Sequence, residues 1–235
     1  MTRAARWASI GLLVLLGTLV RAETTVLAPG YGELDYDPPA PGTYTLPPLG
    51  KAADGTVLNA SGKLLRLAEA LDGKLVLMGF IYTHCPDMNG CPLASYVMKQ
   101  VQARLLEDGE LRDQVRLISL SFDPELDTPE AMRQYSHHFK REDFDWRFLT
   151  TASEADLQPI LQGYGQFREK LYNSDGSYAG SMSHILRVYL IDRDQRIRNI
   201  YSAGFLHRET AVNDLKTLLL EERETEAAAA VPAVP

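Results

Sequence analysis

The two cysteines of this 235-residue chain lie close together, at the end of an apolar segment. Cys85 and Cys91 are separated by five residues, they follow the near-continuous apolar run 74–82, and an amphipathic segment comes directly after them. A cysteine pair in a loop between a buried strand and a helix can form a redox disulfide, bind a soft metal ion, or do both.

A single structural disulfide is the simplest alternative, because two nearby thiols pair in an oxidising compartment unless something keeps them reduced. Bridging Cys85 and Cys91 would close only a short loop, which adds little stability in the chain-entropy view. The pair also follows a predicted buried strand instead of tying distant elements together. We therefore favour a functional role for both cysteines.

The N-terminus has the pattern of a secretory signal. Arg3 and Arg6 precede an apolar run over residues 7–20, and Val20-Arg21-Ala22 provides small residues at the positions read by a signal peptidase. The run is shorter than the ~20 residues needed to span a bilayer and within the roughly 7–15 residues of a signal core. We predict cleavage after Ala22, with an uncleaved anchor as the alternative. Either form places the domain outside the cytoplasm, in the periplasm or anchored to the inner membrane.

Charge excludes two classes of partner. Loss of residues 1–22 removes three arginines and no acidic residue, so the net charge falls from −7 to −10. An acidic chain of this kind is a poor match for nucleic acid or for an anionic membrane surface. Membrane attachment is expected only through an uncleaved N-terminal segment.

Composition divides the rest of the chain into three parts. Residues 23–50 hold six of the 13 prolines and are expected to form an extended, unpacked lead-in. Residues 51–221 alternate strand and helix patterns and are expected to form one domain. Residues 222–235, which end in an alanine run and Val-Pro-Ala-Val-Pro, are expected to be a disordered tail after a fraying helix end.

The pattern of the domain predicts an α/β fold with a mixed sheet, helices on both faces and an N-terminal hairpin around Ser61-Gly62. Apart from that hairpin, strands are expected at 74–82, 115–122, 147–149, 185–191 and 196–201. Helices are expected after Cys91, at 128–138 behind the pair Thr128-Pro129, from Ser153, and at 207–220.

Four segments in this order resemble the SCO/SenC family of thioredoxin-fold copper proteins, over roughly residues 50–220. They are Tyr82-Thr83-His84-Cys85-Pro86-Asp87 with Cys91-Pro92, Ser121-Phe122-Asp123-Pro124 with Asp127-Thr128-Pro129, Trp146-Arg147-Phe148-Leu149-Thr150, and Ser183-His184. The resemblance implies a thioredoxin-like fold and a copper-binding protein of the cell envelope. Such a protein helps to load the binuclear copper site of a cytochrome oxidase, or another copper enzyme, and can receive copper from a donor protein.

The resemblance places the family's copper ligands on Cys85, Cys91 and His184. Two soft thiolates and one imidazole suit copper in either oxidation state better than hard cations. One feature departs from the family, which usually has three residues between its cysteines. The longer spacer, with the turn-forming pair Asn89-Gly90, either lets both sulfurs converge at the helix start or shifts Cys91 away from the ion.

The remaining histidines and methionines are expected to have other roles. His84 is expected to point away from Cys85, because neighbouring residues at a strand end face opposite ways. Methionines usually fill core or surface space. We therefore expect Met88 and Met182 to fill such space. We expect His137, His138 and His207 to be solvated at helix positions. Of the two acids in the second motif, we expect Asp127 to cap the following helix and Asp123 to help shape the site.

A thiol–disulfide oxidoreductase is the main alternative function, with Cys85 and Cys91 as its catalytic pair. Ordinary members of that class have two residues between their cysteines and a proline facing them. Here no proline occurs between Pro159 and Pro232, and His184 is expected to occupy the facing position. A thiol peroxidase fits less well, because the threonine and arginine that it requires near the cysteine are not at the right positions.

The signal segment gives a direct prediction. If residues 1–22 are removed on export, mass spectrometry of the exported protein will find Glu23 at the N-terminus. Recovery of intact Met1 in a membrane fraction would show that the segment is an anchor.

Overall fold

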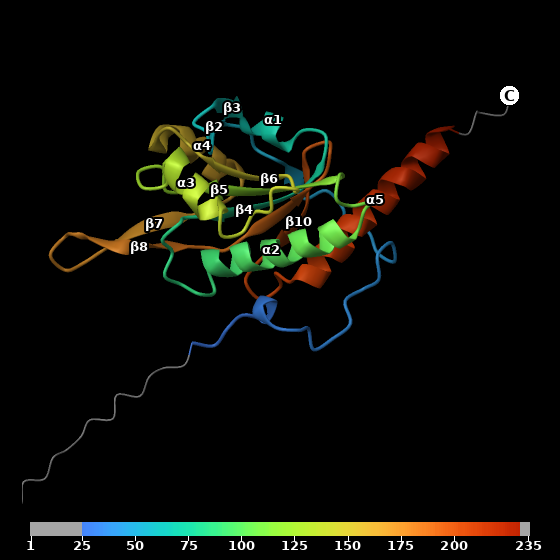
Figure 1. The fold of residues 1–235 in the computed structure, drawn as a ribbon, viewed down its shortest axis with the longest axis horizontal. Helices are drawn as coiled ribbons and strands as arrows, with labels where there is room; N and C mark the ends of the chain where they lie inside the picture. Colours follow the sequence, from blue (N-terminus) through green and yellow to red (C-terminus); the bar gives the residue numbers. More distant parts are fainter. Residues whose placement is uncertain (1–24, 231–235) are drawn as a thin grey trace, which may run out of the picture.

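In the computed structural model, residues 25–230 are described, and they form an eight-stranded sheet with helices on both faces (Figure 1). The predicted signal segment lies outside these residues. The strands of this sheet are β1 (Gly50–Lys51), β2 (Thr56–Asn59), β3 (Leu64–Arg66), β4 (Leu75–Ile81), β5 (Val115–Ser121), β6 (Trp146–Thr150), β9 (Val188–Ile191) and β10 (Arg196–Tyr201). Their order across the sheet is β1-β10-β9-β4-β5-β6-β2-β3, with β2 and β3 forming the predicted N-terminal hairpin.

Helices cover both faces of the sheet. They are η1 (Pro29–Tyr31, a 3-10 helix), α1 (Leu67–Leu71), α2 (Cys91–Glu107), α3 (Pro129–Ser136), α4 (Glu154–Gly163) and α5 (Arg208–Ala230). Helices α2 and α5 lie side by side (Figure 1). Successive strand residues face opposite ways: Met98 of α2 fills the space beside Gly79 on one face. On the other face Phe80 packs edge-on against Tyr164, directly after α4, with ring centroids 5.5 Å apart.

Strand β4 is the centre of the fold and is buried at all seven positions. It pairs parallel with β5, where Ile81 lies opposite Ser121, and antiparallel with β9, where Gly79 lies opposite Val188. The near-continuous apolar sequence of β4 is what a strand covered on both faces requires. The predicted mixed α/β sheet is therefore confirmed, and the ends of β4 and β5 meet the start of β9 at one edge.

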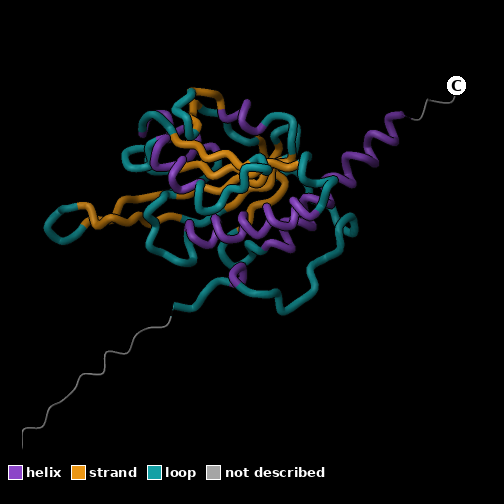
Figure 2. The backbone as a smooth tube through the Cα atoms, in the orientation of Figure 1, coloured by secondary structure: helices purple, strands orange, loops and turns teal. Residues whose placement is uncertain are grey.

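A second, two-stranded sheet projects from the body and was not predicted (Figure 2). Its strands are β7 (Arg168–Tyr172) and β8 (Tyr178–His184). The sequence placed one strand over residues 185–191, but β9 begins only at Val188 and His184 is the last residue of β8. The hairpin was missed because both of its strands are largely exposed, so they lack the alternation that marks a half-buried strand.

The lead-in is packed against the domain, contrary to the expectation of an unpacked segment. The backbone N–H of Gly42 donates to Thr217 of α5 over 3.1 Å, and Tyr44 donates to Asp214 of the same helix over 2.5 Å. Carbonyl groups of the lead-in also accept hydrogen bonds: Arg198 of β10 donates to Leu46 O. The prolines prevent regular structure in this segment, but side chains of the domain satisfy its backbone groups.

Helix α5 is longer than the sequence suggested. It was expected to end near Leu220, with a tail from residue 222, but it continues to Ala230. The extra turns consist largely of glutamate, arginine and alanine, which have high helix propensity. Across residues 25–230, no helix is both long enough and apolar enough to cross a membrane.

Asp214 links three parts of the fold and gives a stability prediction. Its buried carboxylate accepts hydrogen bonds from Tyr44 of the lead-in, over 2.5 Å, and from Asn199 and Tyr201 of β10, over 2.8 and 2.6 Å. Asp214→Ala leaves these three donors without their acceptor, so the free energy of unfolding should fall by about 2–4 kcal/mol in urea titrations. Replacement of the exposed Asp113 by alanine is the control and should change it by less than about 0.5 kcal/mol. An equal effect of both variants would contradict the assigned role of Asp214.

Candidate metal centre

The two cysteines lie on either side of the loop that joins β4 to α2. Cys91 is the first residue of α2, is 1% exposed, and its Sγ accepts a hydrogen bond from Tyr82 N over 3.4 Å. Pro92 follows it in the first turn of the helix, where a backbone N–H has no intrahelical acceptor, so proline is tolerated there. Cys85 lies in the loop and is only partly buried. Both cysteines are free in the structure.

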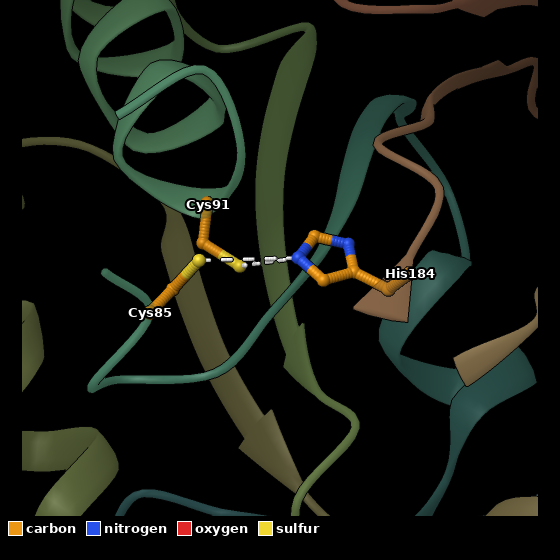
Figure 3. Close-up of side chains that lie close together, drawn as sticks. All are labelled: Cys85, Cys91 and His184. Carbon is orange, nitrogen blue, oxygen red and sulfur yellow. Dashed lines mark hydrogen bonds between the residues drawn. The ribbon is translucent and has the colours of Figure 1, made fainter. Parts of the chain in front are cut away.

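His184 faces both sulfurs from the end of β8 (Figure 3). Its Nε2 lies 3.9 Å from Cys85 Sγ and 3.8 Å from Cys91 Sγ. The three candidate ligand atoms all lie within 4.8 Å of one another. The five-residue spacer therefore does not shift Cys91 away from Cys85 and His184. Of the two arrangements that the sequence left open, the structure has the one in which both sulfurs converge.

The two sulfurs have opposite electrostatic character. A hydrogen bond from the Cys91 thiol, with a smaller contribution from His184, outweighs burial and lowers the pKa of Cys85 to about 3. Burial raises the pKa of Cys91 well above its usual value, and the adjacent Cys85 sulfur raises it further. The metal-free pair thus consists of a partly exposed thiolate at Cys85 beside a buried thiol at Cys91 that acts as its hydrogen-bond donor.

Aromatic rings hold the His184 imidazole in place. The ring of Phe122 lies 4.9 Å from it, and that of Tyr82 meets it edge-on at 5.7 Å, both measured between centroids. Tyr82 also accepts a hydrogen bond from Met182 N over 3.3 Å, which fastens β8 to the end of β4. Among the described residues, the buried Nδ1 of His184 has no hydrogen-bond partner, although metal-binding histidines usually have one there.

Asp127 ties together the loops on either side of the site, which corrects its predicted role as a helix cap. Its fully buried carboxylate accepts bonds from Thr83 N and Oγ1, at 3.1 and 2.6 Å, and from Ser121 Oγ at 2.5 Å. Thr128 caps α3 instead, through Ala131 N. The sequence could not separate two neighbouring side chains that are both common as caps.

His84 and Asp123 form a second, smaller group beside the site. The His84 ring lies against both acids: its Nε2 lies 3.5 Å from Asp123 Oδ2 and its Nδ1 lies 3.9 Å from Asp127 Oδ1. Asp123 is 1% exposed, and burial together with the neighbouring Asp127 raises its pKa. Within residues 25–230 its carboxylate oxygens accept no hydrogen bond.

The remaining histidines and methionines have the surroundings expected of them, with one correction. His137 and His138 are exposed, as expected. His207 is not solvated, because it is only 1% exposed. Its ring nitrogens are paired within the protein: Nε2 donates to Gly32 O over 3.1 Å, and Nδ1 accepts from Glu209 N at the start of α5. Met88 is 47% exposed, whereas Met182, a residue of β8, is buried.

Sequence reasoning missed the hairpin that carries His184. The signal that could have found it is the segment Asn173-Ser174-Asp175-Gly176, whose composition is typical of a tight turn between strands. Gly176 has a φ of 83° there, a conformation that favours glycine.

Comparison with known proteins agrees with this architecture. Two solved structures match it: ScoI of Bradyrhizobium japonicum with copper bound (27% identity, TM-score 0.57, 73% of this chain and 98% of that one) and a SCO1/SenC family lipoprotein of Bacillus anthracis (26%, 0.63, 75% and 99%). A SCO1 protein homolog of Bacillus subtilis is 28% identical over 148 residues, which is 63% of this chain and 71% of that protein. Other curated relatives are matched over 44% to 67% of their length.

The family itself is matched along most of the chain. The match covers residues 54–220, from the N-terminal hairpin into α5, and so includes the cysteine loop, the Asp127 loop and the hairpin with His184. The chain therefore belongs to the SCO1/SenC family.

Proposed function

We propose that this protein binds copper through Cys85, Cys91 and His184 and assists assembly of the copper centre of a cytochrome oxidase or a similar respiratory enzyme. The observation that carries the proposal is the convergence of two sulfurs and one imidazole nitrogen within 4.8 Å. Family membership supports it, since one relative of known structure is described with copper bound.

The donor set fits copper. Thiolates are soft ligands and imidazole is intermediate, so the combination selects copper over the hard cations Mg²⁺ and Ca²⁺. Copper is the cargo in this function. Cys85 is already a thiolate and can take part without losing a proton, whereas Cys91 must release its proton when the metal binds. The Nε2 atom of His184 completes the set.

The site of action follows from the N-terminus and from the family. We propose export to the periplasm, with inner-membrane anchoring as the alternative, because residues 1–22 have the pattern of a signal segment. A relative described as a SCO1/SenC family lipoprotein supports attachment to the cell envelope. The partners would be a copper donor protein and an oxidase subunit, or another copper enzyme, that receives the ion.

A thiol–disulfide reductase that keeps partner cysteines reduced is the second candidate. The half-buried Cys85 thiolate beside a buried thiol favours it, since a sulfur of low pKa is a good leaving group in thiol exchange. Against it, His184 occupies the position that faces the cysteines, where a reductase would place a substrate-binding proline. An imidazole there adds a metal ligand and contributes nothing to the binding of a peptide.

His184 separates the two candidate functions. His184→Ala should weaken copper binding by the reduced protein more than about a hundredfold, because loss of a ligand exceeds the 10- to 100-fold cost of outer-shell changes. The variant should still form the Cys85–Cys91 disulfide. Replacement of the exposed His138 by alanine is the matched control and should bind copper normally.

Oxidase activity in cells carrying each variant completes this test. Loss of activity in both His184→Ala and Cys85→Ser cells is the result expected for copper delivery. Full activity with His184→Ala, combined with none for Cys85→Ser, would show that thiol chemistry is the function.

The pKa of Cys85 gives a separate prediction for the metal-free, reduced protein. With a pKa of about 3, Cys85 is a thiolate throughout pH 5–8, so its alkylation rate by iodoacetamide should change less than about twofold over that range. An ordinary thiol, with a pKa of ~8.5, gains thiolate roughly a thousandfold over the same range. Cys91→Ala removes the hydrogen-bond donor and should make alkylation of Cys85 rise with pH. Peptide mapping checks both, and a steep wild-type profile would contradict the assigned thiolate.

A further inference from the structure

The cysteine loop is hydrogen-bonded to the lead-in through residues of its five-residue spacer. The side-chain amide of Asn89 makes two bonds to the lead-in backbone: Ala28 N donates to Oδ1 over 2.7 Å, and Nδ2 donates to Val26 O over 2.7 Å. A third bond runs from Tyr31 OH to Met88 O, over 2.5 Å. One side chain thus pairs with the lead-in backbone as a neighbouring strand would.

The lead-in has its own anchors at this point, so it can support the loop. Gly30 is buried, and a Cβ there would lie 2.3 Å from Leu206 O and 2.9 Å from the Val97 side chain of α2. The next glycine, Gly32, accepts the bond from the buried His207. The ring of Tyr31 packs on a tyrosine of α2. By contrast, the loop residues 86–88 are all exposed, and only Asn89 and Gly90 behind them are partly or fully buried.

The conformation of the loop also sets the position of the Cys85 sulfur. A Cβ on Gly90 would lie 3.3 Å from Cys85 Sγ and 3.2 Å from Asp87 O, which is tighter than ordinary van der Waals contact. Gly90 N donates to the same Asp87 carbonyl over 3.0 Å, and Asn89 N donates to the Asp87 carboxylate over 2.9 Å. A shift of Asn89 would therefore move this turn against the Cys85 sulfur.

We propose that residues 26–31, here named the strap, hold the cysteine loop in its ligand-binding conformation, with Asn89 and Tyr31 as positioning residues. The inference rests on the proposed copper function and deepens it. A longer spacer has more backbone freedom, which must be lost when the ligands close on the ion. The strap removes that freedom beforehand, so binding loses less entropy.

Copper affinity of the reduced mature protein, measured by competition with a chelator, tests the strap. Asn89→Ala loses both lead-in bonds and should bind copper about 10- to 100-fold more weakly. Tyr31→Phe keeps the ring packing and should show a smaller loss. Asn213→Ala is the matched control, since Asn213 also donates to the lead-in, at Pro39 O over 2.9 Å, but far along the chain from the loop. The control should stay within about twofold of wild type.

A second measurement needs no copper. Amide hydrogen exchange in the metal-free Asn89→Ala protein should accelerate at residues 88–91 and stay unchanged in β4, with an unaltered melting temperature. Wild-type affinity and exchange in Asn89→Ala would overturn the strap, as would an equal loss of affinity in Asn213→Ala. If Asn89→Ala does not fold, a wild-type affinity in Tyr31→Phe overturns it instead. Failure of the wild-type protein to bind copper would overturn the proposed function. It would leave the strap untouched, because the exchange data test the strap without copper.

Discussion

The pairing of β4 with both of its neighbours determines where every part of the candidate site lies. Because β5 runs parallel to β4, the loops that follow both strands leave the sheet at the same edge. Because β9 runs antiparallel to β4, the chain enters β9 at that edge too, a few residues after His184. A strand that is apolar at all seven positions thus brings together two cysteines and a histidine that lies about a hundred residues further along the chain.

Burial then gives the two sulfurs different roles. Cys91 is enclosed at the start of α2, and its sulfur is fixed by the bond from Tyr82 N. Cys85 lies in a loop whose middle residues are exposed, so it is the sulfur that a partner protein can reach. The Asp127 carboxylate keeps the loops after β4 and β5 together, through Thr83 and Ser121. In the proposed copper site, a fixed deep ligand and an accessible outer ligand would form an arrangement from which the ion is passed on by ligand exchange.

The sequence predicted the elements that have a strong hydrophobic pattern. It failed for exposed strands and for contacts between residues distant in sequence. The buried strands and the helix starts at Thr128 and Ser153 were predicted because apolar runs and capping residues are local signals. The β7–β8 hairpin was not, since its residues are mostly exposed. The role of Asp127 and the packing of the lead-in depend on partners distant in sequence. Convergence of Cys85, Cys91 and His184 could be proposed only from the family resemblance.

The hairpin makes His184 the least firmly held of the three candidate ligands. The hairpin belongs to a separate two-stranded sheet, joined to the site through Tyr82 and the chain leading into β9. The imidazole is oriented by the rings of Phe122 and Tyr82, while its Nδ1 lacks a hydrogen bond among the described residues. These edge-on and tilted ring contacts fix the imidazole less tightly than a hydrogen bond to its second nitrogen does. A ligand held in this way can leave the ion while both sulfurs remain, and the two-sulfur state left behind is the one that thiol chemistry uses. The two candidate functions, copper delivery and thiol reduction, would therefore differ at this site by the position of one histidine.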